Sequence, residues 1–241
     1  MGWALQLALG AAISGTVAAG ARRLNALTPS GAWAACLVGT VLFAGGGWSW
    51  LVLVGTFFVS ASALTFWTPP GEGLSDRSLD RAGRRWDQVA ANGGIATLAA
   101  AIHGLSGWPL GFGIAAGAVA AAAADTWGTE IGRWSARPPR LITSGTPVPR
   151  GTSGGITVIG TIAELGGALT VAAVAAALAG QASSSRLFVA TVAAGFSGAL
   201  LDSVLGATIE NRLRWVNNSV VNLLATGWGA AVVLVASRWW R

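Results

Sequence analysis

The sequence predicts an all-α fold, a polytopic integral membrane bundle of seven or eight transmembrane helices in a single domain over residues 1–241. Composition is the first reason, since 53% of the residues are hydrophobic and only 10% are charged, whereas soluble domains carry about 25% charged residues. The second reason is a mean hydropathy of +0.61. The third is the recurrence of apolar runs of about 20 residues, the length that crosses roughly 30 Å of hydrocarbon.

The apolar runs define eight expected helices. In chain order they span residues 2–20, 30–45, 47–67, 87–105, 108–127, 155–180, 186–209 and 218–237. The second run is short and is joined to the third by GGGWSW, so it is either a full span or a re-entrant segment. The first run has no positively charged start, and Arg22 and Arg23 follow it, so we expect a retained span and not a signal peptide.

Arginine placement predicts the orientation of the bundle. With eight spans, all but three of the 15 Lys and Arg residues, which are all Arg, fall on one side. The exceptions are Arg186, Arg238 and Arg241; the others are Arg22, Arg23, Arg77, Arg81, Arg84, Arg85, Arg133, Arg137, Arg140, Arg150, Arg212 and Arg214. By the positive-inside rule the rich side is cytoplasmic, and the protein lies in the cytoplasmic (inner) membrane. If the second run is re-entrant, the N-terminus and Arg22 and Arg23 change sides. Membrane topology thus accounts for the net charge of +6, and we expect no nucleic-acid partner.

Three residue types have ordinary structural explanations. The 35 glycines let helices approach closely, which favours packing in lipid. The single cysteine, Cys36, excludes an intramolecular disulfide and a Cys-based metal site. His103 falls on the Arg-poor side, where we expect a loop residue.

Polar residues recur at four-residue spacing at the Arg-rich ends of three spans, and residues with this spacing share one helix face. The sets are Arg84, Gln88 and Asn92; Asp202, Gly206 and Glu210; and Asn218, Asn222 and Thr226. For any one of these residues, a hydrogen bond between helices is an equally good explanation. The coincidence of the sets on one side favours a common site.

Two carboxylates end the fifth expected span, in AAAADTWGTEIG. Asp125 and Glu130 are about 140° apart around a helix, so an unbroken helix cannot aim both at one point. Either Gly128 interrupts the helix, or the two acids have different roles. An acid at the centre of an inserted helix costs about 2.5 to 3.5 kcal/mol, so we expect a metal ion and arginines to offset its burial.

The segment RGTSGGITVIGT, from Arg150 to Thr161, opens the sixth expected span. A Gly-rich turn before a helix exposes backbone amides at the positive end of the helix dipole, where anions bind. Carboxylates with Mg²⁺ and substrate phosphates, together with Arg and backbone amides, are the usual components of phosphoryl transfer. Glu164 lies deeper in this span and faces the bundle interior, either as a hydrogen-bonding residue or in a substrate pocket.

Five segments, in order from about Leu27 to Gly229, resemble the polytopic membrane family that includes chloroplast phytyl-phosphate kinase of vitamin E biosynthesis. They are RRWDQVAANGG, AAAADTWGTEIG, PRLITSGTPVPRGTSGGITVIGT, GALLDSVLGATIE and VNLLATGWGA. The resemblance implies a membrane kinase that converts an isoprenyl or phytyl monophosphate into the diphosphate, with Mg²⁺ and with CTP or another nucleoside triphosphate as donor. The partners would be this lipid phosphate, the nucleotide and membrane lipids, and the prenyl tail would lie between Gly- and Ala-rich helices. The sequence favours no oligomeric state.

The residues and the resemblance together suggest roles at this site. Catalysis and Mg²⁺ binding fall to Asp125, Glu130 and Asp202. Phosphate or nucleotide binding falls to Arg84, Arg85, Gln88, Asn92, Thr126, Arg150, Gly151, Thr152, Ser153, Gly154, Gly155, Ser203, Asn218 and Asn222. The sequence departs from the family pattern at Ser153, where Asn is usual, and at Glu164, where a small residue is usual.

Three other activities fit parts of the same pattern. A prenol kinase would need Asp125 or Glu130 as a general base for a free alcohol. A lipid-phosphate cytidylyltransferase would release pyrophosphate. An ion-coupled transporter also places acids in broken helices, although its acids usually lie near the midplane of two related halves.

Overall fold

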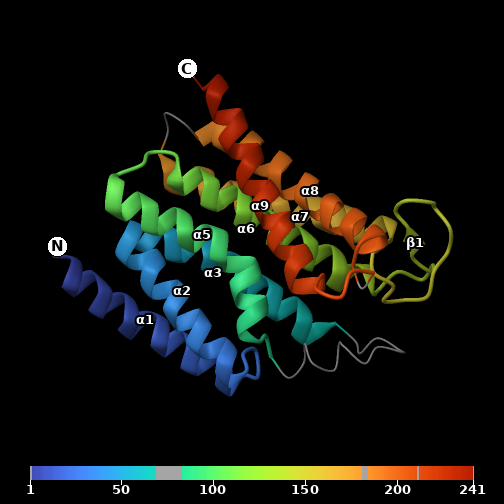
Figure 1. Ribbon diagram of the computed structural model, residues 1–241, viewed down its shortest axis with the longest axis horizontal. Coiled ribbons are helices and arrows are strands. Elements are labelled where there is room, and N and C mark those ends of the chain that lie inside the picture. Colours follow the sequence, from blue (N-terminus) through green and yellow to red (C-terminus); the bar gives the residue numbers. More distant parts are fainter. Residues whose placement is uncertain (1, 69–82, 181–183, 211, 241) are drawn as a thin grey trace.

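Residues 2–68, 83–180, 184–210 and 212–240 are described by the computed structural model of the chain, and they form eight α-helices (Figure 1). The helices are α1 (Trp3–Arg23), α2 (Pro29–Gly46), α3 (Trp48–Trp67), α5 (Trp86–Ser106), α6 (Gly111–Gly132), α7 (Val158–Ala179), α8 (Ser184–Thr208) and α9 (Asn218–Ala236). A short 3₁₀ helix, η1 (Ser237–Trp239), follows α9. Each expected span corresponds to one helix, so the predicted all-α membrane bundle is confirmed.

The connection between α6 and α7 contains the only strands in the described part of the chain, and they were not predicted. Strands β1 (Arg140–Leu141) and β2 (Gly155–Ile156) pair antiparallel, with Arg140 opposite Ile156. Because β2 takes up Gly155 and Ile156, α7 begins later than the expected start of its span at residue 155.

The short second run is a full helix and not a half-length segment. Its 18 residues rise about 27 Å, and α2 packs along both α1 and α5. Thr28 caps the helix by accepting the Gly31 N–H at 3.1 Å, and Pro29 occupies the first turn, where its missing N–H costs nothing. Gly47, with φ of +74°, then makes the turn into α3.

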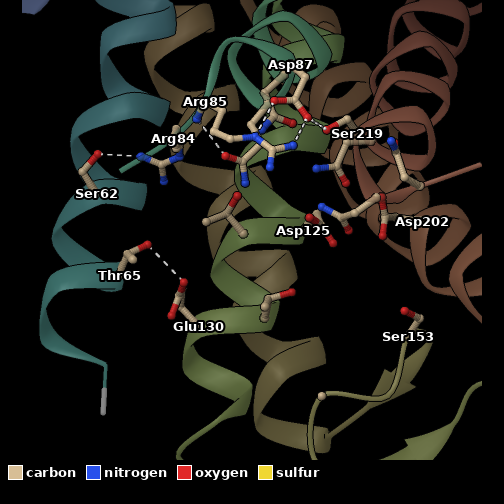
Figure 2. Close-up of a pocket in the computed structure, with 18 of the residues that line it drawn as sticks. Ser62, Thr65, Arg84, Arg85, Asp87, Asp125, Glu130, Ser153, Asp202 and Ser219 are labelled. Atoms are coloured by element: carbon tan, nitrogen blue, oxygen red, sulfur yellow. Dashed lines mark hydrogen bonds and ion pairs between the residues drawn. The ribbon is translucent and has the colours of Figure 1, made fainter. Parts of the chain in front are cut away.

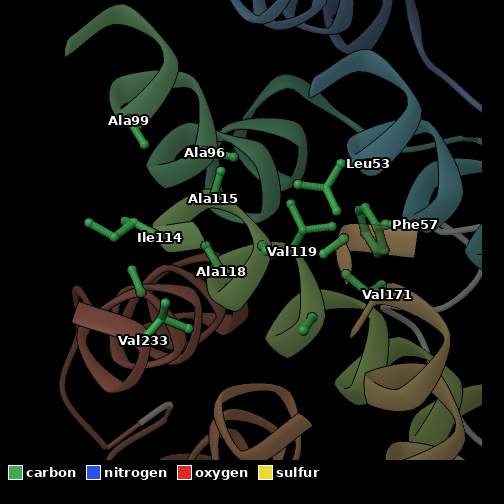
Figure 3. Close-up of a cluster of buried hydrophobic side chains, with 14 of the residues drawn as sticks. Leu53, Phe57, Ala96, Ala99, Ile114, Ala115, Ala118, Val119, Val171 and Val233 are labelled. Atoms are coloured by element: carbon green, nitrogen blue, oxygen red, sulfur yellow. The ribbon is translucent and has the colours of Figure 1, made fainter. Parts of the chain in front are cut away.

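Helix α6 lies at the centre of the bundle, with α3, α5, α7, α8 and α9 packed around it (Figure 3). Its residues 115–124, nearly all Ala, are buried. A Cβ atom at Gly117 would lie 2.3 Å from the Gly229 carbonyl oxygen, so glycine is what allows α6 and α9 to touch backbone to backbone. The other seven helices are long and apolar enough to cross a membrane. Because protein surrounds α6, this helix can carry polar residues that a lipid-facing helix could not.

Successive helices alternate in direction, and the described ends of the chain lie at the same end of the bundle (Figure 1). The opposite end, here called the Arg-rich end, contains the C-termini of α1, α3, α6 and α8 and the N-termini of α2, α5, α7 and α9. Described arginines at this end are Arg22, Arg23, Arg84, Arg85, Arg133, Arg137, Arg140, Arg150, Arg212 and Arg214, whereas Arg186 and Arg238 lie at the other end. Arg77, Arg81 and Arg241 fall outside the described residues. A cytoplasmic position for the Arg-rich end remains a prediction.

Candidate functional site

A polar cavity of about 610 Å³ opens at the Arg-rich end (Figure 2). Its walls come from α3, α5, α6, α8 and α9, together with the turn between α1 and α2 and the turn that precedes β2. The volume is in the range of small-molecule binding sites, roughly 300 to 1,000 Å³. The cavity is therefore large enough for a phosphorylated ligand.

All of the sequence-predicted site residues except Arg150 and Thr152 line this cavity. Those that line it are Arg84, Arg85, Gln88, Asn92, Asp125, Thr126, Glu130, Gly151, Ser153, Gly154, Gly155, Asp202, Ser203, Asn218 and Asn222. The fold thus gathers polar segments from four helices and one turn, all far apart in the sequence, into one hollow. What each residue does there remains a prediction.

Asp125 of α6 and Asp202 of α8 form the acidic centre of the cavity (Figure 2). Their carboxyl groups are within hydrogen-bonding range of each other, and Glu210 and Glu164 are close enough to repel Asp202. Two ionised carboxylates at such a separation repel each other unless a proton or a cation lies between them. Oδ2 of Asp202 is buried and has no hydrogen-bond partner among the described residues.

Glu130 lies on the α3 side of the cavity, apart from the aspartate pair (Figure 2). Helix α6 continues unbroken through Gly128, so the two acids of the DTWGTE segment point in different directions. Thr65 Oγ1 donates to Glu130 Oε1 at 3.0 Å, and Arg133 forms an ion pair with Oε2 at 3.0 Å. Of the two alternatives the sequence left open, an interruption of the helix at Gly128 is therefore excluded, and different roles for the two acids remain a prediction. Within the described ranges, no three Asp, Glu, His or Cys residues form a group that could hold a metal ion.

Gly128 has a packing role. A Cβ atom there would lie 2.5 Å from Cγ of Glu164, so glycine leaves the space in which this acid rests on α6. Glu164 is only 6% exposed, does not line the polar cavity, and its Oε2 has no hydrogen-bond partner in the part of the chain that the structure describes. It lies close enough to Asp125 and Asp202 for the three acids to interact electrostatically. Glu164 therefore lies behind the aspartate pair and not beside a ligand.

The backbone of Arg84 is fixed by the turn between α1 and α2. Its N–H donates to the Ala26 carbonyl at 3.0 Å, and its own carbonyl accepts the Thr28 N–H at 3.1 Å. Gly83 precedes it with φ of +92°, and a Cβ atom there would lie 2.6 Å from the backbone of Leu27. Arg84 consequently enters the cavity from a rigid backbone.

The Arg84 guanidinium group lies against α3. Its Nη1 donates to Ser62 Oγ at 2.8 Å, and its Cζ lies 5.9 Å and 5.7 Å from the ring centroids of Phe57 and Phe58. Stacking on aromatic faces is a property of the planar guanidinium that lysine does not share. The positive charge is thus held at a boundary between polar and aromatic walls.

Arg85 is engaged by Asp87, which was not among the predicted residues. Arg85 donates to both carboxylate oxygens of Asp87, at 3.0 Å and 2.8 Å, a bidentate geometry typical of strong Arg–carboxylate pairs. Asp87 also accepts the Ser219 hydroxyl at 2.9 Å, which links the first turns of α5 and α9. The Arg85 N–H donates to Gln88 Oε1 at 2.9 Å and so caps α5. This network joins two helix N-termini at the cavity wall.

The Gly-rich turn packs on α8 and does not open α7 directly. Gly151 and Gly154 have φ of +86° and +75°, and a Cβ atom at Gly154 would lie 2.5 Å from the Ser203 carbonyl oxygen. The first turn of α7 is capped instead by Thr157, whose Oγ1 accepts the Gly160 N–H at 3.1 Å. The N-terminus of α7 therefore lies outside the cavity lining, whereas Gly151, Ser153, Gly154 and Gly155 of the turn belong to it, and anion binding by the turn remains a prediction. The helices whose first turns line the cavity are α5 and α9.

Arg150 and Thr152 hold the loop together and lie outside the cavity lining. Arg150 donates to the carbonyl oxygens of Arg133 and Ser135. The Thr152 hydroxyl donates to the Pro149 carbonyl at 2.8 Å. These two side chains are the predicted phosphate ligands that the structure does not bring to the site.

Several cavity residues were given no role from the sequence: Ser62, Thr65, Asp87, Thr129, Asn217 and Ser219, together with Glu210, which was placed only on the stripe of Asp202. The four-residue spacing from Asp125 to Thr129 could have identified Thr129 as a member of the site. Thr226 was on one of the predicted polar stripes but does not line the cavity. It shares a stripe with Asn222, yet its hydroxyl donates to the buried Ala91 carbonyl at 3.0 Å, so it joins α9 to α5.

The chain matches one family of integral membrane proteins and several individual relatives. A family model described as "Integral membrane protein DUF92" matches residues 12–230. An uncharacterized membrane protein of Synechocystis is 32% identical over 212 residues, which cover 86% of this chain and 81% of the relative. Protein PGR of Arabidopsis thaliana is 33% identical over 222 residues, covering 82% and 77%. The chloroplastic protein VTE6 of Arabidopsis thaliana is 27% identical over 223 residues, covering 88% and 66%. No solved structure matches the chain.

Proposed function

Because the chain belongs to the DUF92 family of integral membrane proteins, and VTE6 is among its relatives, we propose that it is a membrane-embedded phosphotransferase. The proposed substrates are an isoprenyl or phytyl monophosphate and a nucleoside triphosphate, with CTP as the expected donor. The products are the prenyl diphosphate and the nucleoside diphosphate. The reaction would take place at the Arg-rich end, which we propose to be cytoplasmic.

The observation that carries this proposal is the Asp125–Asp202 pair in a polar cavity that Arg84 also lines. Opposed carboxylates from two helices, next to a guanidinium group and several amides and hydroxyls, can hold a polyphosphate with its counterion. A protein that only packed helices together would have little need for such a pair, because burying it without a ligand is costly.

The residues present fit a Mg²⁺ ion. Mg²⁺ is usually held by one or two carboxylates together with substrate phosphates and water, so a third protein carboxylate is not required. Asp125 and Asp202 would hold the ion, and the unpartnered Oδ2 of Asp202 is an available ligand atom. Bound Mg²⁺ would neutralise charge on the nucleotide phosphates. Glu130, whose oxygens are engaged by Thr65 and Arg133, would instead fix the position of α6.

The chain's own residues would bind and orient the two phosphates. Arg84 would hold the acceptor phosphate, and the amides of Asn92, Asn218 and Asn222, which line the same cavity, would donate to phosphate oxygens. An oxygen of the acceptor monophosphate would attack the terminal phosphorus of the nucleotide, and the bond from that phosphorus to the bridging oxygen would break. Because the attacking oxygen is already anionic, positioning and charge neutralisation suffice, and no strong base is needed.

The proposal is tested with the purified full-length protein in detergent, supplied with Mg²⁺, labelled CTP or ATP, and either a prenyl phosphate or a prenol. Release of nucleoside diphosphate with formation of prenyl diphosphate is the expected result. Pyrophosphate release would indicate a cytidylyltransferase, and turnover of the free alcohol alone would indicate a prenol kinase. Absence of product with every prenyl acceptor, from protein that still unfolds cooperatively, would refute the proposal.

A further inference from the structure

A second cavity, of about 350 Å³, lies between α1, α2, α3 and α5, and its lining is almost entirely apolar. Val17 of α1, Leu42 of α2, Leu51 of α3 and Val89 of α5 are among the side chains that line it. This space, here called the apolar cavity, has no role in the chemistry described above. Its chemistry suits a hydrocarbon ligand.

The apolar cavity and the polar cavity share one wall. Arg84, Gln88 and Asn92 line both of them; Gln88 and Asn92 share one face of α5, and Arg84 lies just before this helix. The Arg84 guanidinium lies over Phe57 and Phe58, which belong to the apolar side. A ligand with an anionic head and an apolar tail could therefore place its head at Arg84 and its tail beyond it.

The apolar cavity also reaches the outer surface of the bundle. Helix α2 packs extensively on α1 and α5 but much less on α3, so the space between α2 and α3 is left open. Three of the lining residues, Val17, Val52 and Val59, are 57%, 45% and 66% exposed. In a membrane this surface faces lipid, so a tail can enter sideways without crossing water.

The helices packed around α6 approach it closely at their glycines in the described part of the chain. A Cβ atom at Gly195 would lie 2.9 Å from Cβ of Ala120, and one at Gly198 would lie 2.6 Å from Cβ of Ala121. These small residues bring helix backbones together and leave no room between them. The apolar cavity lies between other helices that carry Gly and Ala, with Gly39, Gly55 and Gly93 in its lining, so it gives a specific location to the expected tail site between Gly- and Ala-rich helices.

We propose that the apolar cavity binds the hydrocarbon tail of the acceptor lipid phosphate, while its phosphate group is held at Arg84. This inference rests on the proposed phosphotransferase function and adds to it the location and size of the tail site. Because the cavity holds only a limited volume of hydrocarbon before it opens to lipid, the side chains that line it determine how well tails of different length bind. Two glycines limit that volume, since both Gly55 and Gly93 line the cavity.

Space-filling substitutions test the proposal. A Cβ atom at Gly55 meets nothing within 4 Å, and one at Gly93 lies 3.4 Å from Val38, so Gly55→Leu and Gly93→Leu fill the cavity without a backbone clash. Gly94→Leu is the matched control, because Gly94 is the next residue of the same helix, lines neither cavity and has open space for a Cβ atom.

The measurement is kcat/KM for geranyl phosphate and geranylgeranyl phosphate in each variant. We expect both cavity variants to lose about tenfold or more in kcat/KM for the long tail relative to the short one, mainly through KM, because excess methylenes then no longer fit. Gly94→Leu should keep the wild-type ratio. An unchanged ratio in folded cavity variants would overturn the tail site while leaving the phosphotransferase function in place.

A second measurement needs neither turnover nor variants. Wild-type protein is labelled with a photoreactive geranylgeranyl phosphate, and the modified peptides are identified by mass spectrometry. Labelling of α2 and α3, competed by unlabelled prenyl phosphate but not by phospholipid, is expected. Labelling confined to α6–α9, or competed equally by phospholipid, would show that the cavity holds ordinary bilayer lipid only. Labelling at α2 and α3 without turnover of any prenyl phosphate would refute the proposed function but not the tail site.

Discussion

Asp125 of α6 and Asp202 of α8 meet across the polar cavity, although 77 residues separate them in the sequence (Figure 2). Neither acid has another described carboxylate close enough to complete a metal site from protein groups alone. We therefore expect the pair to bind a metal ion whose remaining ligands are oxygen atoms of a phosphate or of water. Two consequences of this relationship can be measured separately.

Asp125→Asn and Asp202→Asn should abolish phosphotransfer without destabilising the protein. Each substitution removes a group that would hold the metal, and losing a transition-state interaction of this kind typically lowers kcat by about 100- to 1,000-fold. Each also removes one of two acids that repel each other, so Tm in detergent should stay constant or rise. Arg186→Gln, at the opposite end, is the control and should change neither. A large fall in Tm with Asp202→Asn would indicate a structural pair.

Mg²⁺ and nucleotide should stabilise the wild-type protein together more than either does alone. A ligand present at about 100 times its Kd stabilises the folded state by roughly 2.7 kcal/mol, which is several degrees in Tm. Chelation with EDTA should remove the nucleotide-dependent part of the shift, and Asp202→Asn should never show it. Equal stabilisation by nucleotide with and without Mg²⁺ would argue against a metal held by the aspartate pair.

Glu130 should prove mainly structural. The side chains of Arg133 and Glu130 are only 13% and 5% exposed, so Glu130→Gln leaves a buried cation without its partner, which costs about 3 to 5 kcal/mol. The double variant Glu130→Gln with Arg133→Met should recover much of the lost stability. Thermal unfolding of the single and double variants checks this. Loss of activity in Glu130→Gln at unchanged Tm would instead support the metal-ligand role that the sequence suggested.

The sequence was sufficient for the helices and for family membership because both depend on local pattern. A membrane requires apolar runs of a set length, and Thr28, Pro29 and Gly47 mark the ends of α2 in the usual way. The motif blocks also identified the family correctly, as the match over residues 12–230 shows. Most of the cavity lining followed from the same blocks, since each carries its polar residues on one helix face.

The sequence did not predict which residues far apart in the chain contact each other at the site. Glu130 accepts a hydrogen bond from Thr65 of α3, which lies 65 residues earlier, and nothing in the apolar α3 sequence indicates this contact. The link from Asp87 to Ser219 joins residues 132 apart. The Gly-rich turn was assigned to α7 from adjacency, whereas its contact with Ser203 on α8 decides its position.

Gly128→Ala should destabilise the protein through a single contact. Its Cβ atom would lie 2.5 Å from Cγ of Glu164, and overpacking of this kind costs about 1 to 3 kcal/mol. Glu164→Ala should restore the stability of Gly128→Ala, because removing the acid vacates that space. Gly166→Ala is the control: its Cβ atom would make ordinary 3.6 Å contacts with Trp127, so it should be neutral or stabilising.

Arg84→Lys should weaken binding of the acceptor phosphate while leaving the fold intact. Lysine keeps the charge, but it loses the planar group that donates to Ser62 and lies over Phe57 and Phe58. The charge would then no longer be fixed where the two cavities meet. We expect KM for the prenyl phosphate to rise by about tenfold, with a smaller change in KM for the nucleotide. Ser62→Ala, which removes only one hydrogen bond to the same guanidinium, should give an intermediate KM. An equal rise in both KM values would mean that Arg84 does not distinguish the acceptor phosphate from the donor.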